Sequence, residues 1–125
     1  MKMRADRFEQ GNAIARHGPE GVLVAGVEHT ESVIVPWRGA VEPWHAAGFD
    51  ALTAEHFARL AAFAPELVIF GSGARLRFAK PALLRPLIEA RIGFETMDSA
   101  AACRTYNVLL AEGRSVLAAL LFEPA

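Results

Sequence analysis

The sequence predicts an α/β domain in which helices pack on a sheet with parallel strands, preceded by an N-terminal β segment. Residues 67–122 alternate strand and helix patterns, and helical connections of about ten residues suit right-handed crossovers between parallel strands. The run Leu67–Phe70 is wholly apolar, which is typical of a strand covered on both faces. Residues 13–36 are rich in β-branched and turn-forming residues. The length of 125 residues fits a single domain, residues 1–125.

The first half of the chain predicts short strands followed by a long loop. A cluster of turn residues at 17–21 interrupts the first β segment. The segment Ser32–Val35 is β-branched and stops at Pro36, which lacks the N–H group that a central strand needs. Residues 37–50 contain two tryptophans among turn-forming residues, so we expect a loop that these side chains pack down. The expected strands are residues 13–16, 22–27 and 32–35.

The second half predicts three helices and three strands. Leu52–Ala64 carries an apolar stripe at positions i, i+3, i+4 and i+7, and Pro65 ends it. A second helix, entered through Pro81, is expected at 82–91, with Pro86 near its first turns. A third helix begins at Asp98 or Ser99 and ends at Gly113, a residue suited to a left-handed stop. The expected strands are residues 67–70, 94–97 and 115–122.

Composition and charge exclude several functional classes. Apolar residues make up 53 % of the chain and charged residues 22 %, which indicates a globular protein. Thirteen lysines and arginines balance fourteen acids, giving a net charge of −1. No surplus of positive charge is available to neutralise a phosphate backbone, so we expect no nucleic-acid partner. A single cysteine excludes an intramolecular disulfide framework and a four-cysteine zinc site.

The N-terminus and the apolar runs predict a cytoplasmic protein with no membrane insertion. The first nine residues mix both signs of charge, and no secretory signal pattern follows them. Asp6 and Glu9 argue against a mitochondrial presequence, which avoids acids. The longest apolar run, Val116–Phe122, is too short to cross a bilayer.

Three stretches together resemble a known family. They are Leu67–Gly73, Phe94–Ser99 and Ala102–Leu109 running into Glu112–Arg114. Their order and spacing are similar to those of the Mth938-like domain family, whose members include a mitochondrial complex I assembly factor, an adipogenesis-associated protein and many uncharacterised bacterial proteins. The resemblance implies a layered α/β domain with a mixed central sheet of five strands and an N-terminal β hairpin. It implies no established catalytic activity.

A candidate ligand site lies where the strand 67–70 ends. Glycines there let a backbone approach a ligand, and ligands of α/β sheets gather at the carboxyl ends of parallel strands. Asp98 ends a neighbouring strand, so parallel pairing would bring it to the same edge. A tight strand exit explains the same glycines, a helix cap explains Asp98, and a backbone contact explains Asn107. The candidate residues are Gly71, Ser72, Gly73, Arg75, Asp98, Arg104 and Asn107.

A candidate partner-binding surface is formed by Trp37 and Trp44, with Phe8 and Phe49 beside them. An exposed aromatic patch of this kind is typical of a protein interface. The alternative is that the loop closes the core, because tryptophan is usually largely buried.

No residue pattern predicts a catalytic set, a metal site or a cofactor. The four histidines lack the spacing of a preformed ligand set, and no Gly-x-Ser-x-Gly elbow is present. Cys103 is either a thiol activated by Arg104 and the helix start or a small packed apolar group.

We therefore expect a non-enzymatic binding or assembly module with a protein partner. The alternative is a protein or enzyme that binds a small polar metabolite at the Gly71–Gly73 loop and the Asp98 edge. In that alternative, Asp98 is the proton acceptor.

Overall fold

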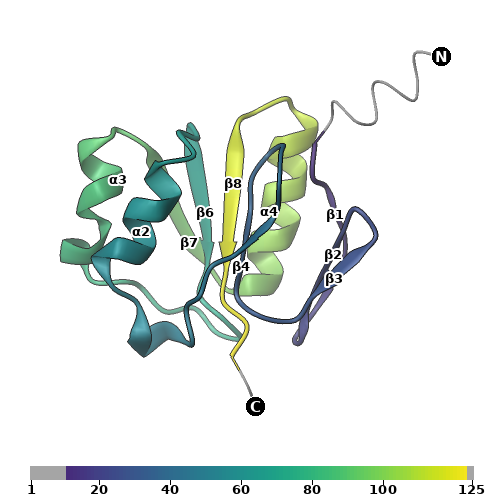
Figure 1. The fold of residues 1–125 in the computed structure, drawn as a ribbon, viewed down its shortest axis with the longest axis horizontal. Coiled ribbons are helices and arrows are strands. Elements are labelled where there is room, and N and C mark those ends of the chain that lie inside the picture. Colours follow the sequence, from purple (N-terminus) through teal and green to yellow (C-terminus); the bar gives the residue numbers. More distant parts are fainter. Residues whose placement is uncertain (1–10, 124–125) are drawn as a thin grey trace.

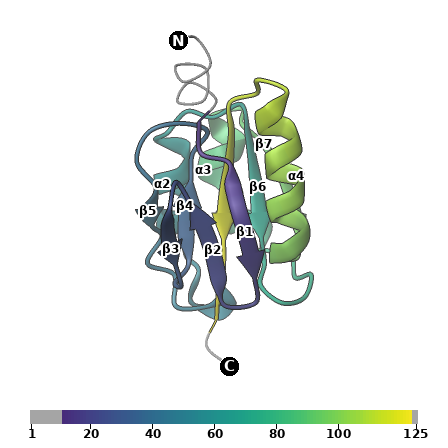
Figure 2. The ribbon, with the colours of Figure 1, turned by 90° about the vertical axis from the view of Figure 1, so that its right-hand side faces the viewer.

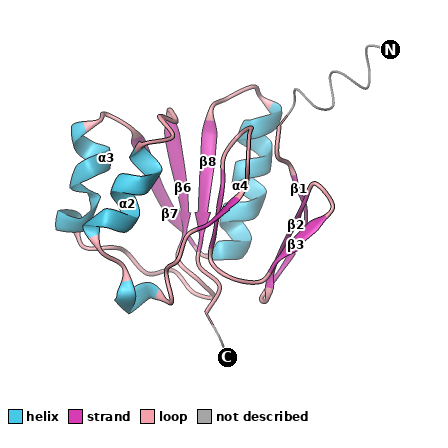
Figure 3. Cartoon of the chain, in the orientation of Figure 1, coloured by secondary structure: helices cyan, strands magenta, loops and turns pink. Residues whose placement is uncertain are grey.

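The computed structural model describes residues 11–123, which contain two β-sheets and three α-helices. In the larger sheet, the strands lie in the order β5-β4-β8-β6-β7. Figure 3 shows β4, β8, β6 and β7 of this sheet in magenta. This sheet is mixed, because β6 pairs in parallel with β7 and β8 while β4 is antiparallel to β8. The predicted α/β architecture with a five-stranded mixed sheet is confirmed. The bounds of its strands are β4 (Val33–Val35), β5 (Glu42–Pro43), β6 (Leu67–Gly71), β7 (Gly93–Met97) and β8 (Val116–Leu120).

The smaller sheet corrects one predicted strand. It consists of β1 (Ile14–Gly18), β2 (Gly21–Val24) and β3 (Val27–His29), all antiparallel. The prediction of one extended segment over 22–27 is wrong, because the chain turns back at Ala25 and Gly26. Both residues have positive φ, 51° and 79°, as the centre of a two-residue hairpin requires. Glycine adopts this region without cost, but alanine does so only under strain, so its presence at position 25 hid the turn.

The helices are α2 (Ala54–Ala61), α3 (Arg85–Glu89) and α4 (Ser99–Ala111). The predicted helix at 82–91 is broken into a 3₁₀ turn, η2 (Pro81–Leu84), and the short α3. Pro86 has no N–H group to continue the hydrogen bonds between these two pieces. The expected loop at 37–50 also contains β5 and leads into the 3₁₀ turn η1 (Phe49–Ala51).

The central sheet has a separate apolar core on each face. Side chains alternate between the faces of a strand, so Val68 and Phe70 lie in one core and Ile69 in the other. Helices α2 and α3 cover the first face, and α4 and the small sheet cover the second (Figure 1). Figure 2 shows the small sheet in front of the central sheet, beside α4. Both faces are therefore buried, which explains the unbroken apolar sequence of β6 and β8.

Helix α4 also ties the N-terminal segment to the domain. The buried Tyr106 hydroxyl lies 3.0 Å from the backbone oxygens of both Asn12 and Pro36. The Asn107 side chain accepts a hydrogen bond from the N–H of Ile14 and donates one to its carbonyl, each at 2.9 Å. Within residues 11–123, no helix is long and apolar enough to span a membrane.

Candidate functional site

Three chain segments meet at the carboxyl edge of the central sheet. Gly71 is in register with Met97 on one side and with Leu120 on the other. Beyond the strands, the N–H of Ser72 donates to the carbonyl of Met97 at 2.8 Å, and the N–H of Ser99 donates to that of Gly73 at 2.8 Å. The Gly71–Gly73 loop and Asp98 thus lie at one edge of the sheet, where parallel pairing predicts them.

Close packing explains the glycine at position 71. A Cβ atom there would lie 2.8 Å from Cδ2 of Leu120 and 3.0 Å from Cα of Ser99. The Ser99 hydroxyl fits beside it, accepting a hydrogen bond from the N–H of Gly73 and donating one to the carbonyl of Leu121, both at 3.0 Å. Gly73 has φ of 105°, a region that favours glycine. The loop is therefore a tight strand exit, held by backbone bonds.

The Ser72 hydroxyl is fully used within the same loop. It donates to the carbonyl of Arg75 at 2.8 Å and accepts from the N–H of Arg77 at 2.9 Å. The side chain is completely buried. A serine in this position organises residues 72–77 and is not free to act as a nucleophile.

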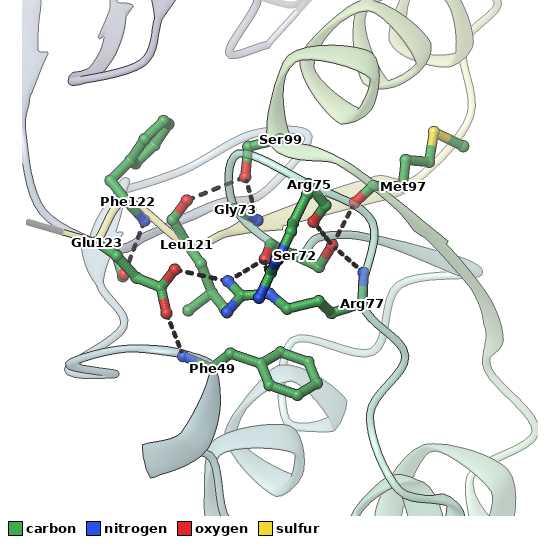
Figure 4. Close-up of polar contacts among 11 residues, drawn as sticks. Phe49, Ser72, Gly73, Arg75, Arg77, Met97, Ser99, Leu121, Phe122 and Glu123 are labelled. Atoms are coloured by element: carbon green, nitrogen blue, oxygen red, sulfur yellow. Dashed lines mark hydrogen bonds and ion pairs between the residues drawn. The ribbon is translucent and has the colours of Figure 1, made fainter. Parts of the chain in front are cut away.

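Arg77 connects this loop to two other segments, as Figure 4 shows. Its guanidinium donates to the carbonyl of Ser72 and pairs with Glu123 at 2.6 Å, and it lies 4.7 Å from the centroid of the Phe49 ring. The Glu123 carboxylate also accepts from the N–H of Phe49 at 2.7 Å. Partial burial raises the pKa of Glu123, but Phe49 N–H, Arg77 and Arg75 together hold it below its usual value. No local sequence pattern predicts this ion pair, because Arg77 and Glu123 are far apart along the chain.

A cleft of about 1310 Å³ opens at the same edge. Its walls come from six segments: the tip of the β1–β2 hairpin, the segment before β4, the loop before η1, the loop after β6, the start of α4 and the residues after β8. We call the small and apolar lining residues the floor of the cleft, and its carboxylates and two histidines the rim. The lining includes His17, Glu20, Glu31, Ser32, His45, Ala46, Ala47, Gly73, Ala74, Asp98, Ser99, Ala100, Leu121, Phe122 and Glu123.

Asp98 and Gly73 line this cleft, but Arg104 and Asn107 do not. The helix axis rises about 1.5 Å per residue, which carries these two side chains away from the edge where Asp98 lies. Arg104 is exposed on α4, and both polar atoms of Asn107 are bonded to Ile14. Arg75 is exposed on the loop after Gly73 and is likewise outside the cleft lining. The predicted constellation of one carboxylate, two guanidinium groups and an amide is therefore not assembled.

The Asp98 carboxylate caps helix α4. Its Oδ1 atom accepts a hydrogen bond from the N–H of Ala101 at 2.8 Å. The capping alternative for Asp98 is thus confirmed, and a cap of this type stabilises a helix by about 1 kcal/mol.

The proposed exposed patch around Trp44 is wrong. Trp44 is only 1 % exposed, and its indole N–H donates to the carbonyl of His56 at 3.0 Å. Its ring packs edge-on against Phe57 and Phe70, so it closes the core beneath α2. Trp37 is half-buried, and Phe8 lies outside the described residues. Large exposed apolar side chains occur instead at Leu76 and Phe78, on the loop held by Ser72 and Arg77.

The packing alternative for Cys103 is confirmed. The side chain is 1 % exposed, and burial raises the pKa of its thiol to about 12, against a smaller lowering by Arg104. Burial also raises the pKa of Tyr106, whose hydroxyl is bonded to backbone oxygens. Neither group is poised for proton transfer or nucleophilic attack near neutral pH. Among residues 11–123, no group of three or more histidine, cysteine or acidic side chains is placed to hold a metal ion.

Comparison with known proteins identifies the family. A family model described as a protein of unknown function (DUF498/DUF598) matches residues 14–121. The chain belongs to the DUF498 family. A solution structure of a Mth938-like domain from Bordetella pertussis is 29 % identical, with a TM-score of 0.80 over 90 % of this chain and 86 % of that one. The resemblance drawn from the three sequence stretches is therefore confirmed.

Two curated relatives of this DUF498 chain bear on function. An uncharacterised protein of Rhodobacter capsulatus is 36 % identical over 99 % of this chain and 95 % of its own length. NADH dehydrogenase (ubiquinone) 1 alpha subcomplex assembly factor 3 of Bos taurus is 33 % identical over 68 % of this chain. That match spans about half, 47 %, of the bovine protein. The family thus has no assigned activity and includes relatives named as assembly factors.

Proposed function

We propose that this DUF498 protein is a non-enzymatic binding module that docks a segment of a partner protein in the cleft at the carboxyl edge of its sheet. The observation that carries the proposal is a large cleft whose buried polar side chains already have hydrogen-bond partners. The buried hydroxyls at its wall are those of Ser32 and Ser99, and each is bonded to backbone atoms. Such a cleft offers a surface for contact, and neither of these serines is free to act as a nucleophile.

The nearby acidic and thiol groups support a binding role over a catalytic one. Asp98 is held by the N–H of Ala101, and Glu123 is held by Arg77 and Phe49. A general base needs a geometry that reaches a substrate proton, together with a pKa near the working pH. The pKa of Glu123 is lowered from its usual value, so this carboxylate is a weaker base than an ordinary glutamate. The pKa of Cys103 is raised to about 12, so its thiol stays protonated near neutral pH.

The curated relatives support the class of partner. The bovine protein is named as an assembly factor for a subcomplex of NADH dehydrogenase. By analogy, the proposed partner of this chain is a protein subunit of such an enzyme, and the proposed compartment is the cytoplasm.

Affinity isolation from the native host tests this function. Ala47 lines the cleft and is exposed, so Ala47→Trp fills the docking space with an aromatic ring. Ala111→Trp places the same ring at an exposed position outside the lining and is the matched control. We expect the tagged wild type and Ala111→Trp to retain one stoichiometric subunit of NADH dehydrogenase and Ala47→Trp to lose it. Equal recovery with both variants, or no stoichiometric protein with the wild type, overturns the proposal.

A second candidate function is binding of a small polar metabolite, because Gly73 and Asp98 line the same cleft. A thermal-shift screen of polar metabolites tests it, since a ligand at 100 times its Kd adds about 2.7 kcal/mol of stability. Asp98→Asn preserves the helix cap and removes the charge. A ligand whose stabilising effect survives both Asp98→Asn and Ala47→Trp would not bind here, which excludes this function for the cleft.

A further inference from the structure

We infer that the cleft takes an extended, largely apolar segment that carries at least one arginine or lysine side chain. The inference rests on the proposed docking function and names the chemistry of the partner. Three features of the cleft support it: its volume, its floor and the balance of charge along its rim.

The volume favours a chain segment over a compact metabolite. Pockets for drug-sized ligands have volumes of about 300–1,000 Å³. The cleft exceeds that range at about 1310 Å³. The lining comes from six separate chain segments, and an extended peptide is an occupant that can contact all of them.

The floor has room for a polypeptide backbone. Ala46, Ala47, Gly73, Ala74 and Ala100 line the cleft with side chains no larger than a methyl group. Phe122 is half-buried and adds apolar surface, which stabilises contacts with apolar side chains of an occupant, whereas Leu121 is fully buried. Small side chains leave space close to the wall, so a main chain can approach it.

The rim carries acidic side chains and no lysine or arginine side chains. The acidic residues are Glu20, Glu31, Asp98 and Glu123. The chain as a whole is nearly balanced, with thirteen basic and fourteen acidic side chains. The asymmetry is therefore a property of this surface and is complementary to a cation.

Two of these carboxylates remain available for a partner. Arg77 pairs with Glu123, and the start of α4 holds Asp98. Glu20 and Glu31 are exposed and form no ion pair within residues 11–123. Their chain neighbours Gly21 and Thr30 are in close contact, since a Cβ atom at Gly21 would lie 3.0 Å from Cα of Thr30. Glu20 and Glu31 therefore belong to two segments that meet at one end of the cleft. A basic side chain of the occupant is expected at this end of the cleft.

Two designed peptides test the charge class directly. The basic probe is acetyl-Leu-Arg-Leu-Arg-Leu-amide, and its counterpart has glutamate in place of arginine. Titrated into the full chain and followed by backbone NMR, the basic peptide should shift the amides of Ala46, Ala47 and Ala100. The acidic peptide should bind about tenfold more weakly, because like charges disfavour its approach.

Charge-neutral variants locate the cation. Glu20→Gln with Glu31→Gln should weaken the basic peptide about fivefold, a typical loss for removing charge complementarity at an exposed site. Glu55→Gln with Glu112→Gln removes the same charge from exposed positions outside the lining and should change nothing. The circular dichroism spectra should be identical in all cases.

Several outcomes overturn the inference. One is the absence of amide shifts at peptide concentrations of about 1 mM, where even weak complexes form. Another is equal binding of both peptides, and a third is equal weakening by the two pairs of substitutions. A concentration-dependent dimer that Ala47→Trp dissociates would assign the cleft to a second copy of this chain.

The two proposals fail in different ways. If Ala47→Trp abolishes partner capture while Glu20→Gln with Glu31→Gln and high salt do not, docking stands and the basic segment is wrong. If the peptides bind as expected and no partner is captured, the chemistry of the cleft stands and the assembly function is wrong.

Discussion

Arg77 and Glu123 join the loop after β6 to the residues after β8, with 2.6 Å between their charged atoms. The two side chains are 22 % and 31 % exposed, and the Glu123 carboxylate also accepts a hydrogen bond from the N–H of Phe49. Three segments that are distant in sequence are thus held at one wall of the cleft. The pair positions the C-terminal strand end beside Gly73, and its loss should loosen that wall.

Replacing the carboxylate of this pair should make stability depend differently on pH. The folded protein holds the pKa of Glu123 below its usual value of 4.5, so its stabilising contribution is complete above that pH. The contribution is lost as the pH falls through the lowered pKa. Glu123→Gln should therefore cost about 1 kcal/mol at pH 7, and the cost should shrink as the pH falls below 4.5. Urea unfolding at a series of pH values from 7 downward measures the cost, and a cost that stays constant over the whole series contradicts the prediction.

The close approach at the strand exit predicts that Gly71→Ala is destabilising. The added methyl group would meet Leu120 and the backbone of Ser99 at 3.0 Å or less, so the start of α4 must shift. We expect a loss of about 1–3 kcal/mol, as for other overpacked sites. Gly18→Ala is the matched control, because nothing lies within 4 Å of its Cβ position. Thermal or urea unfolding of both variants tests the prediction, and equal stabilities would refute it.

The contact of Asn107 with β1 predicts local release of the N-terminal sheet. Asn107→Ala removes two hydrogen bonds, one to the N–H and one to the carbonyl of Ile14. Both backbone groups of Ile14 then lose these partners. We expect a loss of about 2 kcal/mol and faster amide exchange in β1, with β6 less affected. Arg104→Ala changes an exposed side chain of the same helix and serves as the control. Uniform acceleration across both sheets would show that the bond has no local role.

Burial of Cys103 predicts slow reaction with thiol reagents. Its pKa of about 12 leaves almost no thiolate at neutral pH, and its side chain is 1 % exposed. Labelling of the native protein should follow the opening of α4, and it should become rapid in denaturant. Cys103→Ala with Ala111→Cys moves the thiol to an exposed position and should react at once. Fast labelling of the wild type under native conditions would restore Cys103 as a reactive residue.

Local patterns predicted the central sheet and the longest helix well. The apolar run of β6, the cap at Asp98 and the stop after α4 are signals carried by neighbouring residues. The break at Pro86 and the turn at Ala25 were missed. In the first case Pro86, at the start of α3, lacks the N–H group that would continue η2 into this helix, and in the second an alanine takes a conformation usual for glycine.

The site was only partly predictable, because its members come from separate segments. Gly73 and Asp98 follow β6 and β7, and parallel pairing of these strands brings both residues to the same edge of the sheet. The alternation of strands and helices along the chain was enough to predict this pairing. The direction of α4 took Arg104 and Asn107 elsewhere, and packing against Phe57 and Phe70 buried Trp44. The walls at His17–Glu20 and His45–Ala47 depend on how loops fold back onto the sheet. No short-range pattern encodes that arrangement.

The cleft forms only when separate parts of the chain have folded together, because its lining comes from six segments. Its walls belong to elements on both sides of the central sheet, so neither half of the molecule can present it alone. A partner would then bind in the cleft only after the helices and both sheets have packed together in their native positions. A partner that binds this surface would therefore distinguish fully folded molecules of this protein from partly folded ones.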